Sequence, residues 1–199
     1  MDWTIFHWLN SATRASDSGQ DAAEIFNAWA IVVLVVVAGG LWLLARPGGA
    51  LRWKMAAASA GLSALVGLAT NVVLSKVWYD QRPFVGHPRQ TVLLIKHARD
   101  NGFPSDHATV AFAVAFAVLA FSRPLGAFLV VAATAIALDR VFVGVHFPAD
   151  LGASVLVGLA SATLVTMLGR PWIERLVVLV SRATDPVITA IRRTPRPGT

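Results

Sequence analysis

Residues 26–45 have the sequence FNAWAIVVLVVVAGGLWLLA, a run of twenty residues without a charged side chain. At a rise of about 1.5 Å per residue, a helix of this length spans about 30 Å, the thickness of the hydrocarbon core of a bilayer. The sequence Arg46-Pro47-Gly48-Gly49 follows and breaks the helical pattern. The run therefore predicts a transmembrane helix that ends near residue 45.

Three further apolar stretches have the same character, at residues 55–75, 106–138 and 150–169. The second of these is too long for one span, and Ser122-Arg123-Pro124 divides it into two helices joined by a tight turn. We therefore predict an all-α fold, a polytopic membrane helical bundle with about five transmembrane helices.

The composition excludes most other classes of protein. Of the 199 residues, 56% are hydrophobic and only 14% are charged, whereas a soluble domain has about 25% charged residues. The absence of Cys excludes disulfide frameworks, zinc–thiolate sites and cysteine nucleophiles. The net charge of +6 fits cytoplasmic loops and membrane lipids as partners, so no nucleic-acid partner is expected.

Two amphipathic segments flank the predicted bundle. Residues 2–13 place aromatic side chains beside polar ones, and residues 173–193 alternate apolar side chains with arginines. Both patterns are typical of helices that lie at the membrane surface. We expect the C-terminal interfacial helix to be interrupted at Pro186, because proline lacks the N–H that a helix interior uses.

The loops fall alternately on the two sides of the predicted spans. Seven Lys and Arg residues lie on the side that includes the polar stretch 76–107, and ten lie on the side that includes residues 170–199. Because cytoplasmic loops carry the excess of basic residues, the second side is predicted to be cytoplasmic and the first to face outward.

Three polar motifs lie on the predicted outer side, and the first is KVWYDQRP at residues 76–83. Its Lys76 and Arg82 lie where the second span leaves the membrane. Two cations near one helix end can hold a phosphoryl group. A lysine that snorkels to the surface beside an Arg-Pro turn would give the same pattern.

The second motif is FPSDH at residues 103–107, at the start of the third span. Ser105 is a preferred N-cap residue, and the unpaired N–H groups of a first helical turn bind anions. His107 lies in that turn, where it can donate a proton to such an anion. The alternative is an ordinary serine cap beside an interfacial histidine.

The third motif is RVFVGVHFPAD at residues 140–150. His146 and Asp150 are four residues apart at the start of the last span, so their side chains can meet. A carboxylate on one imidazole nitrogen fixes the tautomer and makes the other nitrogen a better nucleophile. Arg140 adds a planar fork of donors for phosphate oxygens, although an Asp cap beside an unrelated histidine is also compatible with the pattern.

Together, the motifs supply cations, a capped helix start, a carboxylate-backed histidine and a second histidine. These groups suffice for phosphoryl transfer through a phosphohistidine, and Lys and Arg can neutralise the phosphate charge without a metal ion. We therefore expect no metal or other cofactor. The alternative is that these polar residues only mark the ends of spans.

The motifs resemble the signature of the type 2 phosphatidic acid phosphatase superfamily, which is Lys-x6-Arg-Pro, Pro-Ser-Gly-His and Ser-Arg-x5-His-x3-Asp. The resemblance covers roughly residues 70–155. The strings QRPFV at 81–85 and PSDH at 104–107 are similar to the undecaprenyl-diphosphate phosphatases of the bacitracin-resistance type. The resemblance implies one integral membrane phosphatase domain over residues 1–199, with its catalytic motifs within residues 76–150.

The chain departs from this signature at three positions. Five residues rather than six separate Lys76 from Arg82, so the lysine of the family motif falls on Ser75. Asp106 replaces the glycine of the second motif. An aspartate at this position is the usual form in the bacitracin-resistance type. Asp139 replaces the serine of the third motif.

The resemblance also implies roles for the site residues. His146 attacks the terminal phosphorus, Asp150 orients His146, and His107 protonates the leaving oxygen and then activates water. Asp106 would cap its helix or fix a basic neighbour. The phosphate ligands are then Arg82, Arg140, Ser105 and Lys76, and the candidates for the entrance of the site are His97, Asp100 and Asp106.

The implied function is hydrolysis of undecaprenyl diphosphate, or another polyprenyl diphosphate, to the monophosphate and inorganic phosphate. The substrate would be a carrier lipid recycled at the outer face of the bacterial inner membrane, with its chain in grooves between spans such as 55–75 and 108–120. The alternatives are a phosphatase for phosphatidylglycerophosphate or phosphatidic acid and a non-enzymatic lipid transporter or scaffold.

Overall fold

The computed structural model describes residues 2–45, 47–48 and 51–193, and this part of the chain is helical apart from its loops. Two residues of the predicted break, Arg46 and Gly49, lie outside the described ones. The helical elements are, in order, α1 (Asp2–Ala12), η1 (Thr13–Ala15), α2 (Asp17–Leu44), α3 (Arg52–Val77), α4 (Pro83–Gly86), α5 (Asp106–Leu119), α6 (Arg123–Phe142), α7 (Pro148–Thr163), η2 (Leu164–Leu168) and α8 (Arg170–Arg193).

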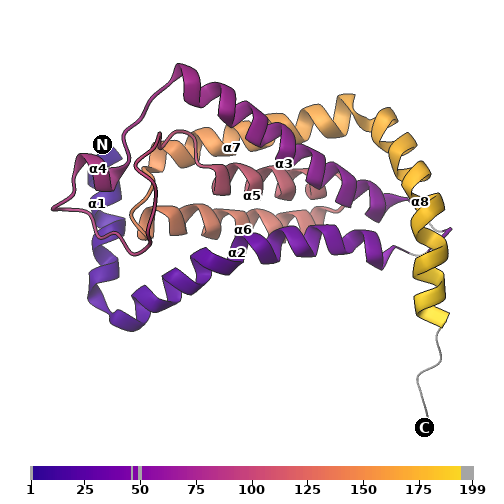
Figure 1. Ribbon diagram of the computed structural model, residues 1–199, viewed down its shortest axis with the longest axis horizontal. Helices are drawn as coiled ribbons and strands as arrows, with labels where there is room; N and C mark the ends of the chain where they lie inside the picture. The colour runs from indigo at the N-terminus through magenta and orange to yellow at the C-terminus, as the bar shows by residue number, and fades with distance from the viewer. Residues whose placement is uncertain (1, 46, 49–50, 194–199) are drawn as a thin grey trace, which may run out of the picture.

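Five of these helices run along the long axis of the molecule, as Figure 1 shows for α2, α3, α5, α6 and α7. Within the described residues, four helices are long and apolar enough to cross a membrane: α2, α3, α6 and α7 together with η2. The apolar helix α5 is shorter, with 14 residues. The all-α bundle with about five membrane helices is therefore confirmed.

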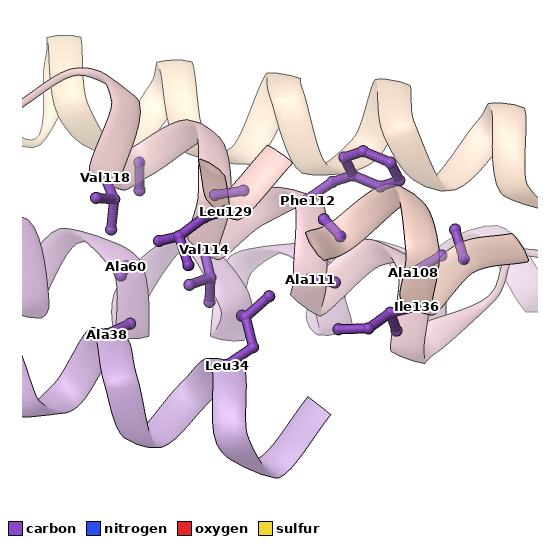
Figure 2. Packing of buried hydrophobic residues seen from close by; sticks show 14 of the residues in the cluster. Leu34, Ala38, Ala60, Ala108, Ala111, Phe112, Val114, Val118, Leu129 and Ile136 are labelled. Atoms are coloured by element: carbon purple, nitrogen blue, oxygen red, sulfur yellow. The ribbon is translucent and has the colours of Figure 1, made fainter. Parts of the chain in front are cut away.

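Helix α5 forms the centre of this bundle, packing against α2, α3, α6 and α7. Its many alanines are fully buried and allow the neighbouring backbones to approach closely, as small residues do in membrane bundles. A Cβ at Gly158 of α7, for example, would lie 2.9 Å from the backbone N of Ala113. Figure 2 shows this core, with α5 residues Ala108, Ala111, Phe112, Val114 and Val118 beside Leu34, Ala38, Ala60, Leu129 and Ile136 from α2, α3 and α6.

The predicted hairpin between α5 and α6 is also present. Helix α5 ends at Leu119 and α6 begins at Arg123, so residues 120–122 make the whole turn. The turn closes tightly, because a Cβ at Gly126 would lie 2.2 Å from Cα of Leu119. Only glycine fits this approach, which packs the first turn of α6 against the last turn of α5.

The ends of the bundle differ in two ways from the prediction. Helix α2 begins at Asp17 rather than near residue 26, because Oγ of Ser16 caps it by accepting a hydrogen bond from Gly19 N–H. The predicted interruption at Pro186 is wrong, since α8 continues through it to Arg193. The turn before the proline is held by Asp185, which forms an ion pair with Lys54 of α3, so the loss of one helical hydrogen bond is tolerated.

Helices α1 and α8 lie across opposite ends of the bundle (Figure 1). Helix α1 is fixed by Asn10, which is 1% exposed. Its amide Nδ2 donates hydrogen bonds of 2.9 Å to the backbone O of both Val92 and Phe142, and its Oδ1 accepts one of 2.8 Å from Val92 N–H. Helix α1 thereby ties the loop around residue 92 to the end of α6.

Candidate active site

A cavity of about 360 Å³ lies at the end of the bundle where α4 is found, between the C-terminal end of α3, the N-terminal end of α5 and the preceding loop. The three sequence motifs, which are far apart along the chain, converge on it. Seven side chains that the sequence predicts for the site line it: Arg82, His97, Asp100, Asp106, His107, Arg140 and His146.

His146 and Asp150 face each other at the start of α7. Oδ2 of Asp150 accepts a hydrogen bond of 2.8 Å from the backbone N–H of Phe147, and the same oxygen lies 3.4 Å from Nδ1 of His146. This separation is longer than a strong hydrogen bond, as is common for catalytic pairs before substrate binds. Both side chains are buried, so the carboxylate acts on the imidazole with little screening by water.

The other nitrogen of His146, Nε2, lies 3.1 Å from NH1 of Arg82. Because a guanidinium has only donors, Nε2 accepts this bond, and the ring proton is then on Nδ1, toward Asp150. Burial, followed by the charges of Arg82 and Arg140, holds the pKa of His146 well below its ordinary value. The ring is therefore neutral at neutral pH with its lone pair on Nε2, which is the form that a nucleophile requires.

Arg82 is held in place by a fork of hydrogen bonds. Its Nε donates to Oδ1 of Asp100 at 2.8 Å, its NH1 to the backbone O of Val145 at 3.1 Å, and its NH2 to the backbone O of Asn101 at 3.1 Å. The side chain is only 6% exposed. A fixed and poorly screened guanidinium beside the nucleophile can hold the oxygens of a phosphoryl group.

Arg140 reaches the cavity from the last turn of α6. Its NH1 donates a hydrogen bond to Oδ1 of Asn27 on α2. Its buried Nε has no hydrogen-bond partner among the residues that the structure describes, and an unsatisfied buried donor on a cation is costly. The guanidinium of Arg140, a residue of the cavity lining, supplies a second positive charge there. Asn27 was not predicted, and its only signal in the sequence is a polar side chain in an apolar span.

Ser105 occupies a different position from the one expected of a phosphate ligand. Its Oγ accepts a hydrogen bond of 3.5 Å from Ala108 N–H as the N-cap of α5, and its own N–H donates to Oγ of Ser154 on α7 at 3.0 Å. The side chain is fully buried and lies outside the cavity lining. The predicted serine cap is present, but the Ser105 hydroxyl binds the first turn of α5 and does not line the cavity.

Asp106 and His107 begin α5 and line the cavity. Oδ1 of Asp106 accepts a hydrogen bond of 2.8 Å from Nδ2 of Asn71 on α3, and the same Nδ2 lies 3.1 Å from Oγ1 of Thr109. The sequence indicated a helix cap or a basic neighbour for Asp106, and the structure gives it a neutral amide. Asn71 was not predicted, although it is a polar residue within the apolar stretch 55–75.

Lys76 lies outside the cavity lining, whereas Ser75 is part of it. Successive residues of a helix point about 100° apart, so the shift of one residue relative to the family motif turns the lysine away from the other site residues. The Lys76 side chain is exposed, and the Ser75 hydroxyl donates a hydrogen bond of 3.0 Å to the backbone O of Val72. The structure thus does not bring Lys76 together with Arg82 and Arg140.

The long loop before α5 is anchored by Asn101, which sequence reasoning missed. Its Nδ2 donates hydrogen bonds of 2.9 Å and 2.7 Å to the backbone O of Ser75 and Trp78, and its Oδ1 accepts bonds of 3.0 Å from two backbone N–H groups of its own loop and the preceding segment. The anchored loop presents Asp100 and His97 to the cavity. The only local signal was the Asn-Gly pair, which is typical of turns.

Gly144 gives the loop before His146 its conformation. Its φ is +87°, a backbone conformation that favours glycine. A Cβ at this position would lie 2.3 Å from the backbone O of Val92. The loop that carries His146 therefore packs directly, backbone to backbone, on the loop that carries His97.

Comparisons with known proteins agree with this geometry. Residues 56–173 match the PAP2 superfamily. The chain is 29% identical over 198 residues to "Undecaprenyl-diphosphatase BcrC" of Bacillus subtilis (strain 168), covering 98% of this chain and 97% of that protein. It is 34% identical over 93 residues to "Bacitracin transport permease protein BcrC" of Bacillus licheniformis, covering 47% of this chain and 45% of that one.

Among solved structures, that of Aquifex aeolicus LpxE has a TM-score of 0.67 and 20% sequence identity, covering 82% of this chain and 93% of that chain. This likeness confirms the fold. The superfamily match spans all three motifs and all of the residues that line the cavity. The chain therefore belongs to the PAP2 superfamily and is a multi-pass membrane phosphatase, a hydrolase that acts on lipid phosphates.

Proposed function

We propose that the chain hydrolyses a polyprenyl diphosphate, with undecaprenyl diphosphate as the expected lipid, to the monophosphate and inorganic phosphate. The observation that carries this proposal is the state of His146, a residue of the cavity lining whose Nε2 accepts a hydrogen bond from Arg82 while Nδ1 faces Asp150. The choice of lipid is supported by the relative from Bacillus subtilis that is named an undecaprenyl-diphosphatase and matches nearly the whole chain.

The reaction has two steps with one covalent intermediate. NH1 of Arg82 transfers its hydrogen bond from Nε2 of His146 to a phosphoryl oxygen, and the freed Nε2 attacks the terminal phosphorus. The bond from phosphorus to the bridging oxygen breaks, and protonated His107 gives its proton to that oxygen. The lipid monophosphate leaves. His107 then takes a proton from water, whose oxygen attacks the phosphohistidine and releases inorganic phosphate with the Nε2 lone pair restored. Arg82 and Arg140 hold the phosphoryl oxygens in both steps.

The lipid chain requires an apolar path beside this site. We expected it between residues 55–75 and 108–120, but α3 and α5 pack closely there, with a Cβ at Gly67 only 2.8 Å from Cγ2 of Thr109. An apolar groove of about 440 Å³ lies instead between α2 and α6. Phe26 and Ile136 line it, next to the Asn27–Arg140 hydrogen bond, so a chain in this groove would lead to the site.

The substrate is tested by phosphate release from undecaprenyl diphosphate, phosphatidylglycerophosphate and phosphatidic acid, each presented to the purified protein in the same detergent. We expect kcat/KM for the diphosphate to exceed the other two by at least about tenfold. A preference for either glycerolipid would replace the proposed substrate with that lipid. A protein that transports a lipid without hydrolysing it would release no phosphate from any of the three.

The nucleophile is tested by His146→Gln, with His87→Gln as the matched control. His87 lies outside the cavity, and its ring centre is 3.9 Å from that of Trp3, with the two rings tilted relative to each other. We expect His146→Gln to lower kcat by about 10³-fold or more, and to abolish the labelled phosphoprotein that rapid quenching traps with terminally labelled substrate. His87→Gln should keep the wild-type kcat and should still form the labelled phosphoprotein. Turnover by His146→Gln at the wild-type rate would exclude the phosphohistidine.

Metal independence is proposed because Arg82 and Arg140 supply the positive charge at the site. Among the described residues, there is no group of three or more His, Cys, Asp or Glu side chains placed to hold a metal ion. We therefore expect turnover to persist in excess EDTA. Strict dependence on added Mg²⁺ would contradict the assignment of charge neutralisation to the two arginines.

We further propose that the site faces outward across the bacterial inner membrane. The chain has no native Cys, so Arg89→Cys in the exposed loop after α4 and Arg123→Cys at the start of α6 give a matched pair of exposed reporters. A membrane-impermeant thiol reagent applied to whole cells should label the first and spare the second. The reverse result would place the cavity on the cytoplasmic side.

A further inference from the structure

Three histidines line the cavity, and phosphoryl transfer uses only two of them. His146 is the nucleophile and His107 the proton donor, which leaves His97 without a role. His97 comes from the loop before α5, and its ring lies 6.4 Å from the ring of His146, edge to face, and 6.5 Å from the ring of Phe84. It thus stands at the reacting end of the cavity rather than on the outer surface of the loop.

The hydrogen bonds of His97 leave one ring nitrogen for a ligand. Nδ1 lies 3.2 Å from the backbone O of Ala98 and 3.9 Å from Oδ1 of Asp100. Since both partners are acceptors, Nδ1 carries a proton. Among the described residues, the structure gives Nε2 no hydrogen-bond partner. Nε2 becomes a second donor when the ring takes up a proton, and a nearby phosphate anion favours that proton.

The charge of the site matches this geometry. A phosphate monoester carries a charge of about −1.5 to −2 at neutral pH, and of the two arginines in the cavity lining, Arg82 already forms an ion pair with Asp100. A diphosphate adds a second, inner phosphate with a further ionised oxygen. Asp100, which accepts a hydrogen bond from Arg82, lies on the Nδ1 side of His97 and would stabilise the charged ring.

We propose that His97 is a specificity-determining residue that binds the inner phosphate of a diphosphate substrate through Nε2. The inference rests on the proposed function, because His97 has an inner phosphate to bind only if the substrate is a diphosphate. Burial, and beyond it the charges of Arg82 and Arg140, keeps the pKa of His97 below its ordinary value. A bound anion that lies among these cations would offset their repulsion and let the ring become charged.

The test compares two inhibitors that differ by one phosphonate, methylenediphosphonate and methylphosphonate, against one fixed phosphate-ester substrate. The wild-type protein should bind methylenediphosphonate at least about tenfold more tightly than methylphosphonate. A difference of this size is the effect of one further hydrogen bond between charged groups. His97→Gln should remove most of this preference by weakening only the diphosphonate. His87→Gln, the matched control outside the cavity, should retain it.

Several outcomes would overturn the proposal. Equal binding of the two phosphonates by the wild-type protein would do so without any variant, and so would an unchanged preference in His97→Gln. A loss of affinity for both inhibitors would show a structural role, and His97→Asn with a thermal unfolding measurement provides a second check on folding. The result does not depend on the lipid, so a failure of the polyprenyl diphosphate assay with an intact phosphonate preference would count against the proposed function alone.

Discussion

Nδ1 of His146 lies 3.4 Å from Oδ2 of Asp150, one helical turn further along the chain. The other carboxylate oxygen, Oδ1, is buried without a hydrogen-bond partner among the described residues. Among the described residues, the carboxylate of Asp150 therefore has two polar contacts, the backbone N–H of Phe147 and the imidazole of His146, both through Oδ2. Asp150 on the Nδ1 side and Arg82 on the Nε2 side therefore favour the same tautomer of His146, with its proton on Nδ1.

Asp150→Asn is expected to lower kcat by about 10³- to 10⁴-fold while KM changes little. The amide keeps the shape of the carboxylate, but its NH2 group can turn toward Nδ1 and force the ring proton onto Nε2, where it blocks attack on phosphorus. Steady-state kinetics with a polyprenyl diphosphate measures the loss, and thermal unfolding checks that the variant is folded. A decrease of less than tenfold would show that Asp150 does not set the tautomer.

Lys76→Gln is expected to keep kcat/KM within about twofold of the wild type. The side chain is exposed and lies outside the cavity, so any effect on a phosphate would be screened by water. Kinetics at low and at moderate ionic strength would measure this. A tenfold or greater loss would mean that Lys76 approaches the substrate when the lipid binds.

The sequence was sufficient for groups that depend on local spacing. His146 and Asp150 meet because they are four residues apart across the start of α7. Ser105 caps α5 because it precedes the first turn of that helix. Lys76 shows the limit of spacing, since one residue of shift in a helix changes which side chain, Lys76 or Ser75, reaches the cavity.

The amide residues that support the site could not be predicted in this way. Asn27 holds Arg140 from a helix 113 residues away, and Asn71 holds Asp106 from 35 residues away. Such contacts arise only when the helices pack, and they leave no periodic trace in the sequence. For the same reason, the hydrophobic pattern predicted the long helices but not the earlier start of α2, which is set by the Ser16 cap.

The acid limb of the pH profile of kcat/KM is expected to lie below pH 6.5, the ordinary value for histidine. Burial, and then the charges of Arg82 and Arg140, lowers the pKa of His146. Because the neutral ring is the nucleophile, a lower pKa keeps the enzyme active to lower pH. The pH profile is measured with a diphosphate lipid and with a monophosphate lipid. An acid limb that belongs to the enzyme is the same for both, whereas a limb caused by titration of the substrate differs between them. A limb at or above pH 6.5 that is the same for both would contradict the assigned state of His146.

The other end of the bundle offers a test of stability without an effect on catalysis. Lys54 of α3 is 2% exposed, and its Nζ donates hydrogen bonds to Oγ of Ser181, at 3.0 Å, and to Oδ1 of Asp185 on α8. The same ammonium lies 5.5 Å from the centre of the Trp42 ring. Asp185 is partly exposed, at 22%, so its removal should cost less than that of a partner in a fully buried pair.

Asp185→Asn is expected to destabilise the protein by about 2 kcal/mol, because it leaves the buried Lys54 charge without its counter-ion. Thermal unfolding in detergent should show a decrease in Tm of about 4–8 °C. The double variant Lys54→Met/Asp185→Asn should recover most of the loss, since no buried charge remains. Because α8 and the cavity lie at opposite ends of the bundle (Figure 1), kcat at a temperature well below Tm should be unchanged. A decrease in kcat without a decrease in Tm would instead reveal coupling between α8 and the active site through the bundle.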